Sequence, residues 1–247
     1  MKKNKYNISA PTDEFCADVL QKLTESSIPF IVGGAHALRQ YSEIYRDTKD
    51  LDIFCKASDA LKFLQIFENH GFLPESRDAR WIVKVFKDDY VVDFIFNSMN
   101  GLSPITDDWF GRSKKFNLFG VKVPCLAAED ILLQKGFIMD KHRFDGADIY
   151  HLILKQGKQM DWEYILRAFD QHWELLLSHL MLFHYIYPSE RDCVPSGIMD
   201  ELLERLSAQR KLPTPIEPVC RGPLISQGQY DKDIKEWKYK TITYENL

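Results

Sequence analysis

The sequence predicts an α+β protein: a mixed α/β N-terminal half, then a helical region, then an extended C-terminal segment. Three observations support this. Short apolar runs alternate with amphipathic helical patterns up to residue 125, long helical patterns follow, and prolines accumulate after residue 211. We therefore expect an α/β core in residues 1–125, a helical domain in residues 126–210, and an extended segment packed on the body in residues 211–247.

The N-terminal pattern is helix, strand, helix. Apolar side chains recur at helical spacing in residues 12–26, and residues 28–32 form a short apolar run that predicts a buried strand. Gly33 and Gly34 interrupt this run, and a helical pattern continues over residues 35–41. The glycine pair is thus predicted to lie where a strand turns into a helix.

Three further strands are predicted in the first half. Residues 50–55 form a second apolar run, and residues 58–71 then have the pattern of an amphipathic helix. Residues 81–86 and 90–96 are rich in β-branched and aromatic side chains, which favours two strands. Residues 87–89 between them predict a hairpin turn.

The second half is dominated by helical patterns. Residues 116–124 predict one more short hairpin, turning at Gly120. After it, helical periodicity predicts helices at residues 127–139, 144–154 and 162–187, and a shorter one at 199–206. The four prolines in residues 211–227 predict extended chain. Aromatic side chains near the C-terminus suggest that this tail docks on the protein: Tyr230, Trp237, Tyr239 and Tyr244.

Composition excludes several classes of protein. The chain has 247 residues, is 45% hydrophobic, and carries a net charge of -4, which argues against a broad basic face for duplex nucleic acid. Its longest apolar segment, residues 175–187, is too short to span a bilayer and is interrupted by His179 and His184. The five cysteines are scattered without a C-x-x-C pair. We therefore expect a cytoplasmic protein with reduced thiols and no membrane association.

Three aspartates in apolar strands predict a metal site. Side chains at positions i and i+2 of a strand point to the same face, so Asp50 and Asp52 project together. Asp93 lies on a later strand that can pair beside the first. Clustered carboxylates repel unless a cation lies among them, and hard oxygen ligands suit Mg²⁺ or Mn²⁺. Three carboxylates can hold two such ions for phosphoryl transfer, with Asp50 and Asp52 shared and Asp93 on the catalytic ion.

The glycine pair and nearby cations predict a triphosphate site. Glycines where a strand turns into a helix allow a phosphate to approach the backbone N–H groups and the helix dipole. Arg46 and Lys49 are close in sequence and add positive charge. The combination predicts binding of a nucleoside triphosphate between Gly33, Gly34 and the metal ions.

These motifs resemble the DNA polymerase β superfamily of nucleotidyltransferases. Its signature is a Gly-Gly or Gly-Ser pair after a strand, then two aspartates in an apolar strand, then a third acidic residue. The resemblance covers about residues 28–97 and implies a mixed, mostly antiparallel sheet with flanking helices. It also implies Mg²⁺-dependent transfer of a nucleoside monophosphate from an NTP. The matching residues are Gly33, Gly34, Asp50, Asp52 and Asp93, with Arg46, Thr48 and Lys49 similar to the smaller bacterial members.

A second resemblance covers residues 124–153. This stretch is similar to the helical segment of bacterial toxin-type and antibiotic-modifying nucleotidyltransferases, with matches at Glu129, Asp130, Lys135, Arg143 and Asp148. The resemblance implies that Lys135 meets the triphosphate and that the later aspartate supports the site. The chain has a sparser basic run than that family, so Asp145 and Asp148 both remain candidates for the supporting role.

The acceptor and the catalytic competence of the chain stay open at this stage. The acceptor hydroxyl can belong to a small alcohol such as an antibiotic, to a protein, or to an RNA 3′ end. By resemblance alone, a cognate antitoxin is a possible partner. Two alternatives are a catalytically silent module of the same fold that binds nucleotide or a protein partner, and a metal-independent structural protein whose acids pair with arginines.

Overall fold

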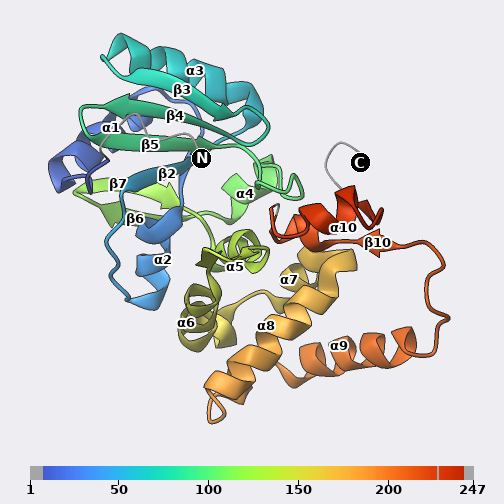
Figure 1. The fold of residues 1–247 in the computed structure, drawn as a ribbon. Helices are drawn as coiled ribbons and strands as arrows, with labels where there is room; N and C mark the ends of the chain where they lie inside the picture. The colour runs from blue at the N-terminus through green and yellow to red at the C-terminus, as the bar shows by residue number, and fades with distance from the viewer. Residues whose placement is uncertain (1–7, 227, 242–247) are drawn as a thin grey trace. The chain divides into compact units, whose positions relative to one another are not determined.

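The computed structural model describes residues 8–226 and 228–241, with all of their side chains except those of residues 76 and 77 (Figure 1). The chain forms two compact units, Met1–Ala127 and Ala128–Leu247. Tyr244, one of the aromatic residues predicted to dock the tail, lies outside the described residues.

The first unit is built on a mixed sheet. Within the described residues it has seven strands in the order β3-β4-β5-β2-β1-β7-β6. The pairs β2–β5 and β1–β7 are parallel and the other four neighbouring pairs are antiparallel, which confirms the predicted mixed, mostly antiparallel sheet. The strands are β1 (Ile31–Val32), β2 (Asp50–Phe54), β3 (Leu73–Asp78), β4 (Ile82–Lys87), β5 (Tyr90–Ile95), β6 (Lys114–Leu118) and β7 (Val121–Cys125).

The helices of this unit are α1 (Asp13–Glu25), α2 (Gly34–Ser42), α3 (Ala57–Asn69) and α4 (Asp107–Arg112). The first three confirm predicted helices to within a few residues. The short helix α4 was not predicted from the sequence, and neither was β3, because its residues LPESRD lack the apolar alternation of a half-buried strand.

The two faces of the sheet have different chemistry. Leu51 and Ile53 of β2 lie on the same face as Val92 and Phe94 of β5, and all four are buried. Helix α3 covers this face, where the ring of Phe63 stacks on Phe94 with centroids 5.1 Å apart. Because side chains alternate along a strand, the residues between these apolar ones point to the opposite face. That opposite face carries the aspartates.

Both predicted hairpins are confirmed. Lys87 pairs with Tyr90, so the first turn consists of Asp88 and Asp89, and Asp88 has a φ of 52°. Leu118 pairs with Val121 around a turn in which both residues have positive φ, as in the type I′ turns that suit antiparallel strands. In the first hairpin, the pairing with Tyr90 makes Lys87 the last residue of β4, whereas the sequence placed it in the turn.

The second unit is mainly helical. Its main helices are α5 (Ala128–Gly136), α6 (Gly146–Gln156), α7 (Trp162–Phe169), α8 (Trp173–Ile186) and α9 (Ser196–Gln209). The prediction of one continuous helix at residues 162–187 is wrong. Asp170 has a φ of 38°, which a continuous α-helix does not accept, and the chain passes through a short 3₁₀ turn there before α8 begins. A small hairpin of β8 (Met139–Asp140) and β9 (Arg143–Phe144) separates α5 from α6.

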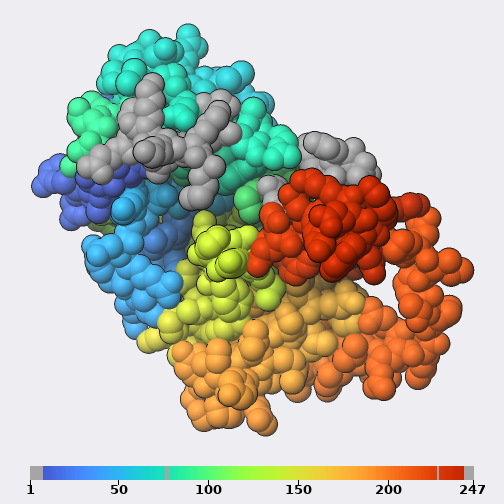
Figure 2. All heavy atoms as spheres, viewed as in Figure 1, coloured from blue at the N-terminus to red at the C-terminus, as the bar shows by residue number. Residues whose placement is uncertain are grey.

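The C-terminal part begins with an exposed stretch. Residues 211–219 are all exposed, and Figure 2 shows this stretch in orange at the surface. The chain then contacts the helical unit: Ile225 O accepts a hydrogen bond from Met139 N (3.2 Å), and Ser226 Oγ donates to Asp140 Oδ2 (2.5 Å). The remaining elements are α10 (Asp231–Lys235) and a parallel pair, β10 (Val219–Cys220) with β11 (Lys240–Thr241).

No helix in the described ranges combines the length and the apolar character needed to cross a bilayer.

Buried His179 makes the stability of the second unit depend on pH. Its Nε2 lies 2.9 Å from the carbonyl oxygen of Gly136, and burial is the main cause that lowers its pKa below the ordinary 6.5. His179 is therefore protonated at a lower pH in the folded chain than in the unfolded chain. The free energy of unfolding should fall as pH falls from 7 to 5, by up to about 1.4 kcal/mol per pH unit for this group.

Urea denaturation at several pH values measures this dependence. His179→Gln should flatten the slope between pH 5 and 7, and His142→Gln, at an exposed position, is the control for exchanging a histidine for glutamine. An unchanged slope in His179→Gln would show that this imidazole does not set the dependence.

Candidate active site

The sheet brings the three predicted aspartates together. Asp50 and Asp52 lie on β2 and Asp93 lies on β5, and in the parallel pairing of these strands Asp52 is directly opposite Asp93. Each of the three offers a carboxylate oxygen, and these oxygens all lie within 4.8 Å of one another. The convergence follows from the register, because a shift by one residue would turn Asp93 to the helix-covered face.

The cluster concentrates negative charge in a partly buried place. Asp93 is only 4% exposed, and Asp50 and Asp52 are half-buried. Two unit charges 4.8 Å apart repel by about 3 kcal/mol at an effective dielectric constant of about 20. Neighbouring groups offset part of this cost: Thr48 Oγ1 donates a hydrogen bond to Asp50 Oδ1 (2.7 Å). Thr48 was predicted to be part of a nucleotide site, and that role stays a prediction.

Lys84 is a site residue that the sequence reasoning missed. It lies on β4 directly opposite Asp93, and its Nζ forms an ion pair with Asp93 Oδ2. Lys84, Asp93 and Asp52 therefore form a row across three adjacent strands on one face of the sheet. The sequence could have indicated it: Lys84 stands between two valines in an otherwise apolar strand, and such a lysine needs a counter-charge on the same face of the sheet.

The glycine pair lies against the aspartates. Gly33 N donates a hydrogen bond to the carbonyl oxygen of Asp52 (2.9 Å), which fixes the start of α2 beside β2. Gly34 has a φ of +55°, and a Cβ built on it would lie 1.8 Å from Asp52 Oδ2. The first N–H groups of a helix have no acceptor within the helix, and Gly33 has no side chain to cap them. The N-terminus of α2 thus offers donors and a partial positive charge next to the carboxylates.

The segment before β2 and the first turn of α2 carry further polar residues. Arg46 and Lys49 are exposed in the segment that leads into β2. The ring of His36, in the first turn of α2, meets Phe119 edge-on with centroids 5.2 Å apart. Burial is the main cause that lowers the pKa of His36, and the nearby Asp50 acts in the opposite direction.

The predicted residues of the second unit form a cluster of their own. Lys135 Nζ lies 2.6 Å from Asp145 Oδ2 and 2.8 Å from Asp148 Oδ2, so this lysine contacts both candidate aspartates. Arg143 also pairs with Asp145, and these partners hold the pKa of Asp145 below its usual range although burial acts in the other direction. The roles of Lys135 and Asp148 toward a nucleotide stay predictions.

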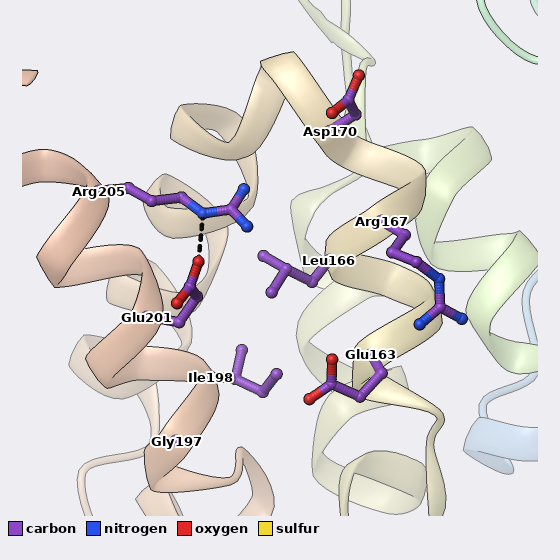
Figure 3. A pocket seen from close by; sticks show the side chains of 8 residues that line it. All are labelled: Glu163, Leu166, Arg167, Asp170, Gly197, Ile198, Glu201 and Arg205. Carbon is purple, nitrogen blue, oxygen red and sulfur yellow. Dashed lines mark hydrogen bonds and ion pairs between the residues drawn. The ribbon is translucent and has the colours of Figure 1, made fainter.

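The second unit also contains a hollow among its described residues. It has a volume of about 680 Å³ and lies between α7 and α9. Figure 3 shows Leu166 and Ile198 facing its interior and an ion pair between Arg205 and Glu201, with Nε and Oε1 2.7 Å apart. Its lining contains none of the predicted site residues.

Replacing Gly34 tests the close approach of α2 to Asp52. Gly34→Ala should lower the free energy of unfolding more than Gly71→Ala, by at least about 2 kcal/mol in urea denaturation. Both glycines have positive φ, but no atom lies within 4 Å of a Cβ at position 71. Gly71→Ala therefore measures only the cost of placing an alanine at positive φ. Equal losses in the two variants would contradict the packing of Gly34 on Asp52.

Solved structures with a similar chain path include two adenylyl-transferring enzymes and one nucleotidyltransferase-like protein. The lincomycin-bound lincosamide antibiotic adenylyltransferase LnuA is 19% identical, with a TM-score of 0.45 over 58% of this chain and 98% of its own. ANT(2″)-Ia in complex with adenylyl-2″-tobramycin is 15% identical, with a TM-score of 0.49 over 65% and 98%. An antigenic nucleotidyltransferase-like protein from Paracoccidioides brasiliensis is 17% identical, with a TM-score of 0.46 over 73% and 90%. At such identities and scores, these structures carry no information about the acceptor of this chain.

No curated protein matches the chain. A protein family described as "Uncharacterised nucleotidyltransferase" matches residues 13–186, which is well over half of the chain and includes every candidate site residue. The chain belongs to this nucleotidyltransferase family.

Proposed function

We propose that the chain transfers a nucleoside monophosphate from an NTP to an acceptor hydroxyl and releases pyrophosphate. One observation carries the proposal: the carboxylates of Asp50, Asp52 and Asp93 converge beside the N-terminus of α2. Negatively charged oxygen ligands lie next to a group of backbone donors, as recognition of a metal-bound triphosphate requires.

The donor set fits Mg²⁺ or Mn²⁺. Three carboxylates supply hard oxygen ligands without any sulfur or imidazole among them. Asp50 and Asp52 would hold both ions, and Asp93 would complete the coordination of the catalytic one. When bound, such ions lower the pKa of an acceptor hydroxyl and neutralise charge on the phosphates.

The chain's own groups would position the triphosphate. The backbone N–H groups after Gly33 point outward from the first turn of α2 and would donate to phosphate oxygens. Glycine at positions 33 and 34 lets the start of α2 pack directly against Phe54 and Asp52, where a Cβ would overlap their side chains. Arg46 and Lys49, which are exposed before β2, would bring positive charge to the same phosphates.

The chemical step is an in-line displacement at the α-phosphorus. The acceptor oxygen forms a bond to the α-phosphorus while the bond from that phosphorus to the oxygen that bridges to the β-phosphorus breaks. The electron pair of the broken bond leaves on pyrophosphate, and the acceptor proton passes to the carboxylate of Asp93. Asp93 is suited to this role because it is the most buried of the three aspartates and lies on the neighbouring strand.

The acceptor remains any of the three hydroxyl classes considered from the sequence: a small alcohol such as an antibiotic, a protein side chain, or an RNA 3′ end. The net charge of -4 disfavours long RNA, because phosphate contacts supply most of the affinity for a long polyanion. A cognate antitoxin and a cytoplasmic location stay predictions.

Loss of a single aspartate should abolish transfer. We expect Asp52→Asn and Asp93→Asn each to reduce transfer of label from [α-³²P]NTP by at least about 100-fold, because each removes a charge that stabilises the transition state. The assay supplies the four NTPs with Mg²⁺ or Mn²⁺ and tests separated small-molecule, protein and RNA fractions of a cell extract as acceptors.

The matched control is Asp89→Asn, an exposed aspartate in the turn between β4 and β5, which should retain wild-type transfer. Equal labelling by wild type and Asp52→Asn would refute the proposed chemistry. Nucleotide binding by wild type in calorimetry, with no transfer to any fraction, would instead identify the chain as a silent binding module.

A further inference from the structure

The ion pair between Lys84 and Asp93 lies at the centre of the proposed metal site. The side chain of Lys84 is 21% exposed and that of Asp93 is 6% exposed, so the pair is largely removed from water. A buried carboxylate without a counter-charge is costly, and the cost rises when two further carboxylates lie within 4.8 Å. The ammonium of Lys84 therefore stabilises a cluster that would otherwise repel itself.

The position of Lys84 is determined by the sheet itself. It is the direct cross-strand neighbour of Asp93 in the antiparallel pairing of β4 with β5. Ile82 and Phe86, two residues before and after it on the same face of β4, are buried. The lysine stem thus lies between apolar side chains, and its charged end is directed along the row toward Asp93.

We propose that Lys84 is a built-in counter-ion that competes with the second divalent cation for Asp93. This inference rests on the proposed function, because it assumes that Asp93 contributes to a metal site. A first ion bound by Asp50 and Asp52 leaves the Lys84–Asp93 pair intact. A second ion that uses Asp93 must share that carboxylate with the ammonium of Lys84 or displace it.

Two consequences follow from the competition. Without metal, removal of the ammonium takes away the positive charge that pairs with Asp93, so the folded state loses stability. When metal is present, removal of the Lys84 ammonium favours binding of the second ion, because that ion no longer meets a positive charge at Asp93. Lys84 is accordingly a positioning residue that keeps Asp93 in place before the substrate complex forms.

The test compares Lys84→Met with wild type, using Mn²⁺ alone as the probe. Methionine keeps most of the apolar stem of lysine and removes the charge. In EDTA, Lys84→Met should lower the melting temperature by several degrees, on the order of 5 °C. At saturating Mn²⁺ the difference should shrink to less than about half, because the bound ions replace the missing charge.

Binding of Mn²⁺, followed by the electron paramagnetic resonance signal of the free ion, gives an independent readout. Wild type should bind one ion more tightly than a second, and Lys84→Met should tighten the weaker step by about tenfold. Lys84→Arg, which keeps the charge, should behave like wild type. Lys87→Met is the matched control and should change neither readout. Lys87 lies on the same strand as Lys84, but its Nζ lies over the ring of Phe72, 5.0 Å from the ring centroid.

A double variant tests whether the effect passes through Asp93. Lys84→Met combined with Asp93→Asn should melt in EDTA within about 1–2 °C of Asp93→Asn alone, because the charge that needed compensation is gone. If Lys84→Met lowers the melting temperature equally with and without Mn²⁺ and leaves Mn²⁺ affinity unchanged, the inference is overturned and the proposed function still stands. If wild type binds no Mn²⁺ at millimolar concentrations, the metal site and the inference both fail.

Discussion

Mutual repulsion among Asp50, Asp52 and Asp93 is the constraint on which the rest of the site depends. Oxygens of three carboxylates lie within 4.8 Å of one another on one face of the sheet, and the opposite face buries Leu51, Ile53, Val92 and Phe94. Such a cluster lowers stability unless neighbouring groups or bound cations offset the charge. The apolar face, with its stacked Phe63 and Phe94, supplies the burial that holds the strands in register against this repulsion.

The groups around the cluster are explained by this constraint. Thr48 donates to Asp50, Lys84 pairs with Asp93, and the N-terminus of α2 begins beside Asp52. Each brings a donor or a positive charge to a different aspartate. Gly34 allows α2 to begin beside Asp52, because a side chain at position 34 would overlap the Asp52 carboxylate.

Much of this arrangement could be predicted from the sequence because it depends on local periodicity. The spacing of Asp50 and Asp52 places them on one face of any strand, and the glycine pair marks the strand-to-helix junction that the structure contains. The hairpin at Asp88 and Asp89 was predicted from its turn residues. The sequence predicted that the Asp93 strand can pair beside the strand of Asp50 and Asp52 but not their relative orientation; the structure shows that β2 and β5 are parallel, with Asp52 opposite Asp93.

What could not be predicted depends on tertiary contacts or on unusual backbone conformations. The break at Asp170 interrupts a sequence whose apolar period continues on both sides, so periodicity alone predicted one helix instead of two. The partner of Lys84 became clear only from the register of β4 with β5. The sequence left open whether Asp145 or Asp148 supports the site. Lys135 forms an ion pair with each of them, so its contacts do not distinguish the two.

The most direct test of the account is a crystal of the chain grown with Mn²⁺ and a non-hydrolysable NTP, with Mn²⁺ located by anomalous scattering. The account predicts anomalous peaks within coordination distance of Asp50 and Asp52, with phosphate oxygens at the backbone N–H groups after Gly33. Mn²⁺ or nucleotide bound elsewhere, with no peak among the three aspartates, would contradict it.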